Sequence, residues 1–320
     1  MSKGTVRVGK VAFVFPGQGS QKIGMGREAF DASNAAREVF ETADRVLDGD
    51  AKRLSTLCFE GPDEELRLTR NTQPAVLTSS IALLRAFEET PDVVAGHSLG
   101  EYSAHVAAGT MRFEDAVRLV RARGEYMQEA VPLGQGAMAA ILKMDRETVE
   151  RICKETGGIV EPVNYNSPGQ IVIAGETKAV EAASEACKAE GARVMPLPVS
   201  APFHSSLMSP AEKRLAPDLG AITFSDPRLP VYVNVDAAAI TSAEKARDAL
   251  IRQVARPVRW DESIHQMVQD GVTLFVEIGI GNALSGMIKR TTEQAVAISV
   301  QKPEDFAAAR EAIAKARELT

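Results

Sequence analysis

Residues 92–109 have the sequence DVVAGHSLGEYSAHVAAG, and they carry the strongest fold signal in the chain. Residues 92–97 form a short apolar run that is typical of a buried strand. Residues 99–108 favour a helix, which Gly109 ends. Between them, residues 96–100 match G-x-S-x-G, a sharp strand-to-helix turn that exposes a serine hydroxyl above a sheet. A strand followed directly by a helix predicts an α/β protein.

The same alternation of strand and helix recurs on both sides of this stretch. Apolar runs predict strands at residues 11–15, 92–97, 273–278 and 295–300, and amphipathic runs predict helices at residues 73–89, 113–131 and 304–318. Alternation of this kind predicts a parallel sheet with helices on both faces.

Residues 137–199 do not follow this simple alternation of strand and helix. They predict the order β-α-β-β-α-β, which is that of the ferredoxin-like split unit. We therefore expect the fold class α/β, with a small ferredoxin-like domain at residues 136–199 inserted into a large domain made of residues 1–135 and 200–320. A cleft between two such domains is the expected ligand site.

Composition narrows the class of protein further. The 320 residues are 45% hydrophobic and 25% charged, which suits an ordinary globular protein of about two domains. A net charge of -6 argues against nucleic-acid binding, which needs a basic face. The three cysteines lie far apart, so we expect neither a disulfide framework nor a metal site. No apolar run approaches the ~20 residues of a membrane span and no signal peptide is visible, so we expect a cytoplasmic protein, and a monomer.

Ser98 is the candidate nucleophile, and a serine hydroxyl needs a proton acceptor. His204 is the candidate base, because it lies where the chain returns to the large domain and can reach over the cleft. His97 directly precedes the serine on the strand, so we expect it to face the other way. No acidic residue lies at a suitable strand end between the two, which favours a serine–histidine dyad. The alternative for Ser98 is a plain helix N-cap.

An oxyanion needs two N–H donors, and losing one typically costs about 3 kcal/mol. The N–H of Leu99, directly after the candidate nucleophile, is one expected donor. The loop at residues 17–19 follows the first strand and is the expected source of the second. The alternative is a dinucleotide-binding loop, but the third glycine of G-x-G-x-x-G is missing.

The helix at residues 113–131 carries Arg118, Arg121 and Arg123. Arg123 lies roughly 60° from the centre of the apolar stripe and is the arginine turned most toward the interior. Its planar guanidinium suits bidentate pairing with a carboxylate, such as the free carboxylate of a dicarboxylic acyl group. A structural salt bridge to a nearby Asp or Glu is an equally good interpretation.

Six motifs occur in order over nearly the whole chain: FPGQGSQ at residues 15–21, QPA at 73–75, GHSLGEY at 96–102, RG at 123–124, NYNSPGQ at 164–170 and FH at 203–204. Together they resemble the malonyl-CoA:acyl carrier protein transacylases of fatty-acid and polyketide synthesis. The resemblance implies an α/β-hydrolase-like large domain with a ferredoxin-like insert. It also implies that Ser98 is the nucleophile, His204 the base and Arg123 the malonate anchor.

The resemblance implies three further site residues. Gln18 and Leu99 would supply the oxyanion N–H groups, and the backbone carbonyl of Gln253 would orient the histidine, which would explain the missing acid. Phe203 before the histidine is similar to malonyl-selective members.

We therefore expect a ping-pong transfer of malonyl from malonyl-CoA to the phosphopantetheine thiol of an acyl carrier protein, with no metal and no redox cofactor. Carrier proteins of this kind are acidic, so we expect docking on a local basic patch. The candidates are Arg252, Arg256, Arg259, Lys289 and Arg290. The alternatives are a serine thioesterase or esterase with the same turn, and a non-catalytic carrier-docking module.

Overall fold

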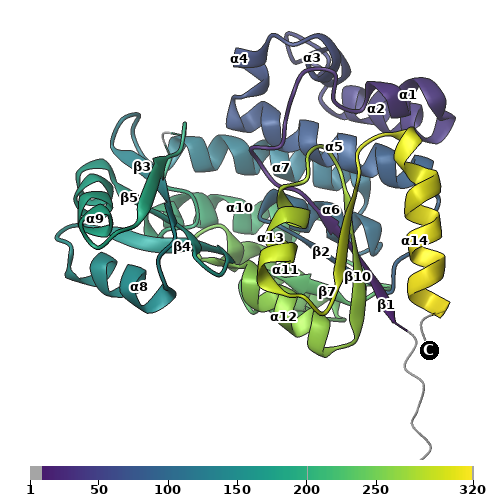
Figure 1. Cartoon of the computed structure of the whole chain (residues 1–320). Helices are drawn as coiled ribbons and strands as arrows, with labels where there is room; N and C mark the ends of the chain where they lie inside the picture. Colours follow the sequence, from purple (N-terminus) through teal and green to yellow (C-terminus); the bar gives the residue numbers. More distant parts are fainter. Residues whose placement is uncertain (1–8, 200, 319–320) are drawn as a thin grey trace, which may run out of the picture.

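The computed structural model describes residues 9–199 and 201–318, which form a mixed α/β fold with two separate sheets. The expected domain limits at residues 1, 200 and 320 lie outside these residues. Figure 1 shows the larger sheet surrounded by helices and the smaller sheet to its left. Among the described residues, none of the helices has the length and apolarity needed to cross a bilayer.

The larger sheet has the strand order β11-β10-β1-β2-β7-β8. The bounds are β1 Lys10–Phe15, β2 Val93–Gly96, β7 Val231–Val233, β8 Ala238–Ile240, β10 Val272–Ile278 and β11 Val296–Val300. Neighbouring strands are parallel except β7 and β8, which pair antiparallel. The expectation of a parallel sheet is therefore wrong at this edge. Residues 234–237 are too few for the crossover that a parallel partner requires, so the chain turns straight back.

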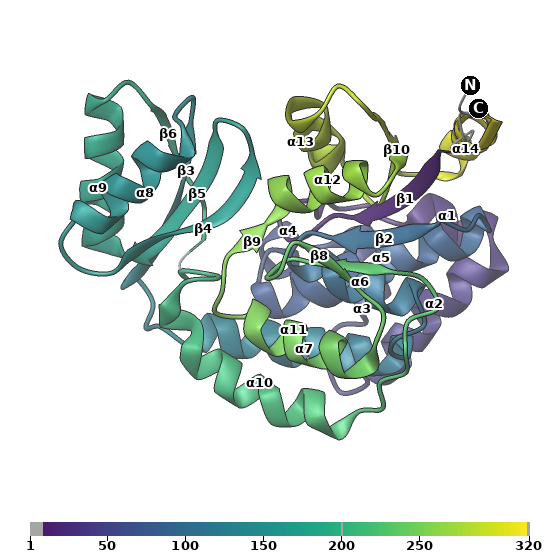
Figure 2. The ribbon, with the colours of Figure 1, turned by 90° about the horizontal axis from the view of Figure 1, so that it is seen from below.

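Helices cover both faces of this sheet, as Figure 2 shows along its edge. Val11, Phe13 and Phe15 of β1 face the core formed with α2, α5, α6 and α7, whereas Ala12 and Val14 face α12 and α13. All five residues are fully buried, which explains why this strand is continuously apolar. The helix bounds are α1 Arg27–Ala32, α2 Asn34–Val46, α3 Leu54–Glu60, α4 Asp63–Leu66, α5 Thr69–Phe87, α6 Leu99–Ala107, α7 Phe113–Glu129, α10 Ser209–Ala221, α11 Ala243–Gln253, α12 Trp260–Gln269, α13 Ala283–Thr291 and α14 Phe306–Glu318.

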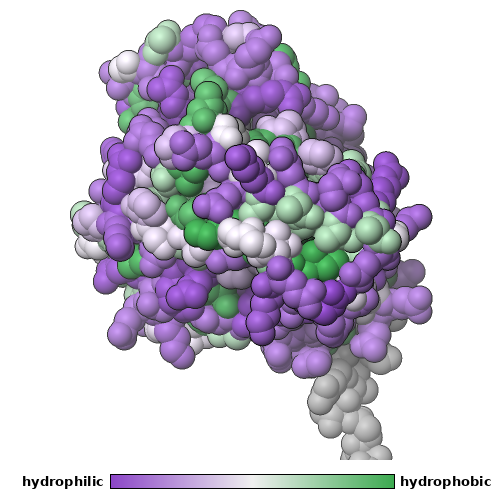
Figure 3. Space-filling view, turned by 90° about the vertical axis from the view of Figure 1, so that its left-hand side faces the viewer, coloured by the Kyte–Doolittle hydropathy of each residue, from purple (hydrophilic) through white to green (hydrophobic). Residues whose placement is uncertain are grey.

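The smaller sheet has the order β6-β3-β5-β4-β9 and is covered by α8 and α9. The bounds are β3 Gly136–Leu142, α8 Arg146–Glu155, β4 Val160–Ser167, β5 Gln170–Glu176, α9 Thr177–Ala189, β6 Arg193–Pro196 and β9 Val258–Arg259. The fifth strand, β9, comes from the C-terminal part of the chain and pairs parallel with β4. The molecular face on this side is mainly hydrophilic, with apolar side chains in small groups (Figure 3).

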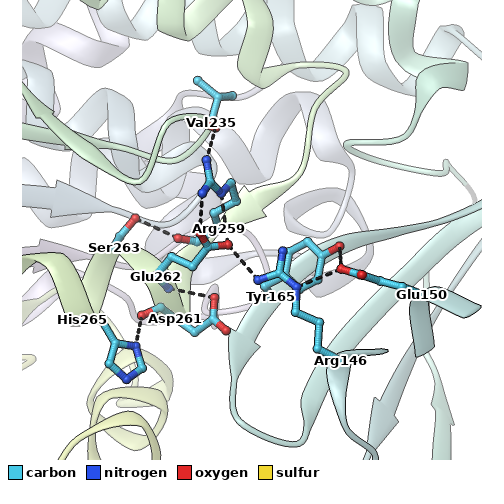
Figure 4. Close-up of polar contacts among 9 residues, drawn as sticks. All are labelled: Arg146, Glu150, Tyr165, Val235, Arg259, Asp261, Glu262, Ser263 and His265. Carbon is cyan, nitrogen blue, oxygen red and sulfur yellow. Dashed lines mark hydrogen bonds and ion pairs between the residues drawn. The ribbon is translucent and has the colours of Figure 1, made fainter. Parts of the chain in front are cut away.

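A cluster of charged side chains lies at the joint between the smaller sheet and α12 (Figure 4). Arg146 of α8 donates to Glu150 and to Glu262 of α12, both at 2.8 Å. Arg259 of β9 also binds Glu262, and Tyr165 of β4 donates to Glu150 at 2.9 Å. The guanidinium of Arg146 lies 4.0 Å from the centroid of the Tyr165 ring. These contacts link the smaller sheet to the larger part of the molecule.

Candidate active site

Ser98 lies at the turn between β2 and α6, with φ 52° and ψ -107°. A non-glycine residue held in such a sparsely populated backbone region costs about 1–3 kcal/mol. The turn is tight because Gly100 lies against the end of β1, where a Cβ would be 2.0 Å from the carbonyl oxygen of Phe15. The predicted strand-to-helix turn is therefore present, with the serine at its apex.

Ser98 and His204 lie together although they are far apart in the sequence. Ser98 Oγ is 2.6 Å from His204 Nε2, and His204 Nδ1 is 2.8 Å from the backbone oxygen of Gln253. A carbonyl oxygen only accepts, so Nδ1 carries the hydrogen and Nε2 is left to accept the serine proton. The Ser98 side chain is not a helix cap, since it makes no capping hydrogen bond within the described residues.

Burial and the nearby Arg123 lower the pKa of His204 from 6.5 to about 3, although the hydrogen bond to the Gln253 carbonyl acts in the other direction. His204 is only 3% exposed, so its charged form is poorly solvated. The imidazole is therefore neutral at neutral pH, which is the form that accepts a proton.

Arg123 of α7 is fully buried beside this pair. Its guanidinium donates to the side-chain oxygens of Gln73 at 2.8 Å and Gln253 at 3.0 Å, and to Ser98 Oγ at 3.2 Å. Among the described residues it forms no ion pair with an Asp or Glu, and its Nε has no hydrogen-bond partner. The structure thus shows a buried cation next to the candidate nucleophile without a contacting carboxylate.

The other two arginines of α7 point elsewhere, which agrees with the prediction that Arg123 is the arginine turned most toward the interior. Arg121 pairs with Asp50 and Asn71, and Arg118 lies on the surface beside Asp115. Gly124 lets α7 approach the start of α5 closely, because a Cβ there would lie 2.7 Å from the Thr69 carbonyl oxygen. This approach brings Arg123 against Gln73 of α5.

The two candidate oxyanion donors, the backbone N–H groups of Gln18 and Leu99, have no hydrogen-bond partner within the part of the chain described. The loop that holds Gln18 lies directly against the turn, since His97 N donates to the Phe15 carbonyl at 3.0 Å. Gln18 lines the same cavity as Ser98. Both donors are therefore free to meet a negatively charged oxygen at this turn.

A cavity of about 400 Å³ opens over Ser98. Its walls come from the loops after β1 and β2, from α5 and α7, from β3 and β4 of the smaller sheet, and from the chain that returns to the larger part of the molecule. They are Gln18, Gly19, Gln21, Arg67, Gln73, His97, Ser98, Arg123, Met127, Met138, Asn164, Leu197, Pro198, Val199, Phe203 and His204. The expected cleft is thus present, and it holds the serine, the histidine and the inward arginine together.

His97 lines the cavity, although we expected it to face the other way. Its ring does lie toward α12, on the side of the sheet opposite α6, with its centroid 5.6 Å from that of Trp260, and its Nε2 lies 2.8 Å from Asn166 Oδ1 of β4. The reason is that β2 ends at Gly96, so His97 belongs to the turn and strand alternation no longer applies. Burial lowers its pKa. His105 is buried in α6 and His265 is exposed on α12.

The sequence interpretation missed two polar residues of the site. Gln73 holds Arg123, and its position within the QPA motif was the signal available. Asn234 accepts from the backbone N–H of Ser98 at 2.7 Å, and no sequence motif marked it. No group of His, Cys, Asp and Glu side chains suited to a metal ion occurs among the described residues.

Fold and site together define a class of α/β proteins that hold a serine–histidine pair at a strand-to-helix turn. The family model described as acyl transferase domain matches residues 12–310. The malonyl CoA-acyl carrier protein transacylase of Bacillus subtilis is 51% identical over 92% of this chain and 94% of the relative, and that of Escherichia coli K12 is 48% identical over 94% and 98%. A malonyl-transacylase solved with its type II polyketide acyl-carrier protein has a TM-score of 0.91 at 47% identity, covering 95% of this chain and 99% of that one. The chain belongs to the acyl transferase family, and within it to the malonyl CoA-acyl carrier protein transacylases.

Proposed function

We propose that this chain transfers a malonyl group from malonyl-CoA, through an ester on Ser98, to the phosphopantetheine thiol of an acyl carrier protein. The observation that carries the proposal is the hydrogen-bonded series Ser98 Oγ, His204 and the Gln253 carbonyl, with the unpaired guanidinium of Arg123 3.2 Å from the same Oγ. The near full-length match to transacylase relatives supports the same reaction.

In the first half-reaction, Ser98 Oγ attacks the thioester carbonyl of malonyl-CoA while His204 Nε2 takes its proton. The C–S bond then breaks, and His204 returns the proton to the departing thiolate of coenzyme A. In the second half-reaction, His204 takes a proton from the carrier's thiol, whose sulfur attacks the ester. The serine oxygen leaves and recovers the proton from His204. The thioester is the substrate, and every proton is accounted for without a redox or metal cofactor.

The tetrahedral intermediate of each half-reaction carries an oxyanion. The unpartnered N–H groups of Gln18 and Leu99 are the proposed donors to it. The Gln253 carbonyl holds the charged imidazole that forms transiently, because it accepts from Nδ1. This replaces the carboxylate of a conventional triad.

Arg123 is the proposed anchor for the free carboxylate of the malonyl group. Burial lowers its pKa, with Tyr102 and Glu101 acting in the opposite direction, yet a guanidinium stays charged in proteins. A buried cation without a contacting anion is costly, and a dicarboxylic acyl group supplies that anion whereas an acetyl group does not. The site thereby favours malonyl over neutral acyl groups.

For the fold we propose an α/β-hydrolase-like large domain, residues 1–135 and 200–320, and a ferredoxin-like insert, residues 136–199. The order β6-β3-β5-β4 in the smaller sheet supports the second part, since it is what a β-α-β-β-α-β unit forms when its first and third strands are central.

Carrier docking on a basic patch also remains a proposal, with fewer candidates. Arg252 is paired with Asp236 and Asp248, and Arg259 with Glu262, so their charges are locally balanced. Three exposed residues, Arg256, Lys289 and Arg290, form no ion pair within the described part of the chain. These three are the proposed contacts to an acidic carrier.

Substituting Arg123 tests the proposed specificity. We expect Arg123→Ala to lower kcat/KM for malonyl-CoA about a hundredfold or more, since breaking a buried ion pair costs about 3–5 kcal/mol. Acetyl transfer should be spared, because acetyl has no carboxylate. The measurement is transfer from malonyl-, methylmalonyl- and acetyl-CoA to a purified carrier protein.

Arg121→Ala is the matched control, as it removes an arginine of the same helix that faces Asp50 instead of the cavity. It should leave the ratio of malonyl to acetyl transfer unchanged. Equal losses for malonyl and acetyl in Arg123→Ala would remove the anchor role. Hydrolysis of the thioester by wild-type protein without transfer to the carrier would favour a thioesterase instead.

A further inference from the structure

Asn234 lies in the turn directly after β7, and its side chain forms hydrogen bonds to the backbone on both sides of His97. Its Oδ1 accepts from the N–H of Ser98 at 2.7 Å, and its Nδ2 donates to the carbonyl oxygen of Gly96 at 2.7 Å. The residue is fully buried. One side-chain amide therefore satisfies the backbone groups on both sides of His97.

This pattern continues a parallel β-ladder. In such a ladder, one residue donates its N–H to the carbonyl before its partner and accepts from the N–H after it. β2 and β7 pair through Val94 with Val231 and Ala95 with Tyr232, and the backbone pairing stops there. The side-chain amide of Asn234 occupies the place of the next peptide unit and extends the ladder as far as Ser98.

Asn234 is itself fixed from two directions. Its backbone N–H donates to Oε2 of the fully buried Glu101 on α6 at 2.8 Å. Its carbonyl accepts from the N–H of Arg259 on β9 at 3.1 Å, and the Arg259 side chain donates to the carbonyl of Val235 at 3.4 Å (Figure 4). The residue thus joins the turn, α6 and the strand that completes the smaller sheet.

The Ser98 backbone needs such support, because an unfavourable conformation persists only where its surroundings hold it. The direction of Oγ toward His204 Nε2 depends on that conformation. We propose that Asn234 is a positioning residue for the nucleophile: its amide holds Ser98 so that Oγ points at the base. This inference rests on the proposed function, because it assigns a role within the same site.

An amide is the side-chain group that fits both contacts at once, since it offers a donor and an acceptor side by side. In Asn234→Asp, a carboxylate oxygen would face the Gly96 carbonyl with no hydrogen between them. In Asn234→Ser, a single hydroxyl is too short to reach both groups. The first variant keeps the side-chain volume and adds repulsion, and the second removes the contacts together with two side-chain heavy atoms.

The test is single-turnover acylation by malonyl-CoA, which separates the maximum rate from the half-saturating concentration. We expect the maximum rate to fall about a hundredfold in Asn234→Asp and at least about tenfold in Asn234→Ser, because small misplacements of reacting groups have effects of this size. The half-saturating concentration should stay within about twofold, since Arg123 and the cavity wall are untouched. If Asn234 had a merely structural role, the variants would lose thermal stability, but the maximum rate would not fall selectively while the half-saturating concentration stays the same.

Asn71→Ala is the matched control. Asn71 is a buried asparagine that donates to the Glu65 carbonyl and accepts from Arg121, away from the cavity. The Asn71→Ala protein should lose thermal stability but keep the wild-type rate of acylation. The inference is overturned if Asn234→Ser acylates as fast as this control, or if neither Asn234 variant folds. Absence of malonyl transfer by the wild-type protein would instead overturn the proposed function.

Discussion

At the scale of single residues, both members of the candidate pair have an unusual backbone. Five non-glycine residues among those described have positive φ, and Ser98 at 52° and His204 at 65° are two of them. Neither residue would adopt this region without support from its neighbours. Gln253 supplies part of that support at both places, because its carbonyl accepts from the histidine and its side chain donates to the Ser98 carbonyl at 3.0 Å.

The lowered pKa of His204 gives a pH prediction. The base form exists above the folded-state pKa of about 3, so kcat/KM for acylation should stay level from pH 8 down to pH 5. Malonyl-pantetheine is the suitable substrate, because it lacks the titrating phosphate of coenzyme A. In Arg123→Ala a neighbouring positive charge is lost, which should raise the pKa of His204. The fall of kcat/KM on the acid side of the pH profile should then begin at a higher pH. A wild-type kcat/KM that already falls with a midpoint near pH 6.5 would contradict the lowered pKa of His204.

The same shift affects stability with a definite sign. The unfolded chain has a histidine pKa near 6.5 whereas the folded chain has one near 3, so the unfolded state binds more protons between these values. Above pH 6.5 this difference in proton binding has no effect on the free energy of unfolding. As the pH falls from 6.5 toward 3, it lowers the free energy of unfolding progressively.

Much of the site could be predicted at this scale. Ser98 follows from its motif and its strand-to-helix context, and the inward direction of Arg123 follows from the apolar stripe of its helix, although the stripe left its role open. Asn234 could not be found, because it acts through a contact between residues 136 positions apart and carries no local pattern. His97 was misplaced because the end of β2 falls one residue earlier than expected.

At the scale of elements, the site lies where two neighbouring parallel strands end. β1 and β2 pair side by side, so the loop after β1 and the turn after β2 meet at one edge of the sheet. This is the edge at which open α/β sheets bind ligands. The N-terminus of α6 starts at the same point, and its backbone N–H groups favour negative charge there.

Gly100→Ala tests this arrangement of elements. An added Cβ would lie 2.0 Å from the Phe15 carbonyl oxygen, so β1 and α6 must move apart. We expect a loss of about 1–3 kcal/mol in the free energy of unfolding, as overpacking typically produces, together with slower acylation. Urea titration and single-turnover acylation are the measurements.

Gly220→Ala is the control for that substitution, because Gly220 lies in α10 and an added Cβ there would point into open space. It should be neutral or stabilising, as alanine favours a helix over glycine by about 1 kcal/mol. Unchanged stability in Gly100→Ala would mean that the contact between β1 and α6 is not as close as described.

The long elements were predictable, and the short ones were not. β1, β10 and α7 carry clear apolar patterns, and the structure places them within a few residues of the expected bounds. β7 and β8 have three residues each and β9 has two, which is too short for a periodic pattern to be visible. Their pairing depends on distant neighbours, so β9 within the smaller sheet could not be expected.

At the scale of the whole molecule, the cavity is built where the chain leaves and re-enters its larger part. One wall comes from α5 and α7, another from β3 and β4, and a third from residues 197–199, 203 and 204. The charged joint of Arg146, Glu262 and Arg259 holds the smaller sheet beside this cavity (Figure 4). The order of strands and helices predicted a two-part molecule with a cleft, but the contacts at the joint could not be predicted from local pattern.

Acylation of Ser98 is measured by mass spectrometry of peptides from protein that is mixed briefly with malonyl-CoA and quenched in acid. We expect a malonyl ester on Ser98 that disappears when holo carrier protein is added, as the malonyl group moves to the carrier's thiol. Ser98→Ala should give no ester. An ester on another residue, or malonyl transfer to the carrier by Ser98→Ala, would show that Ser98 is not the nucleophile.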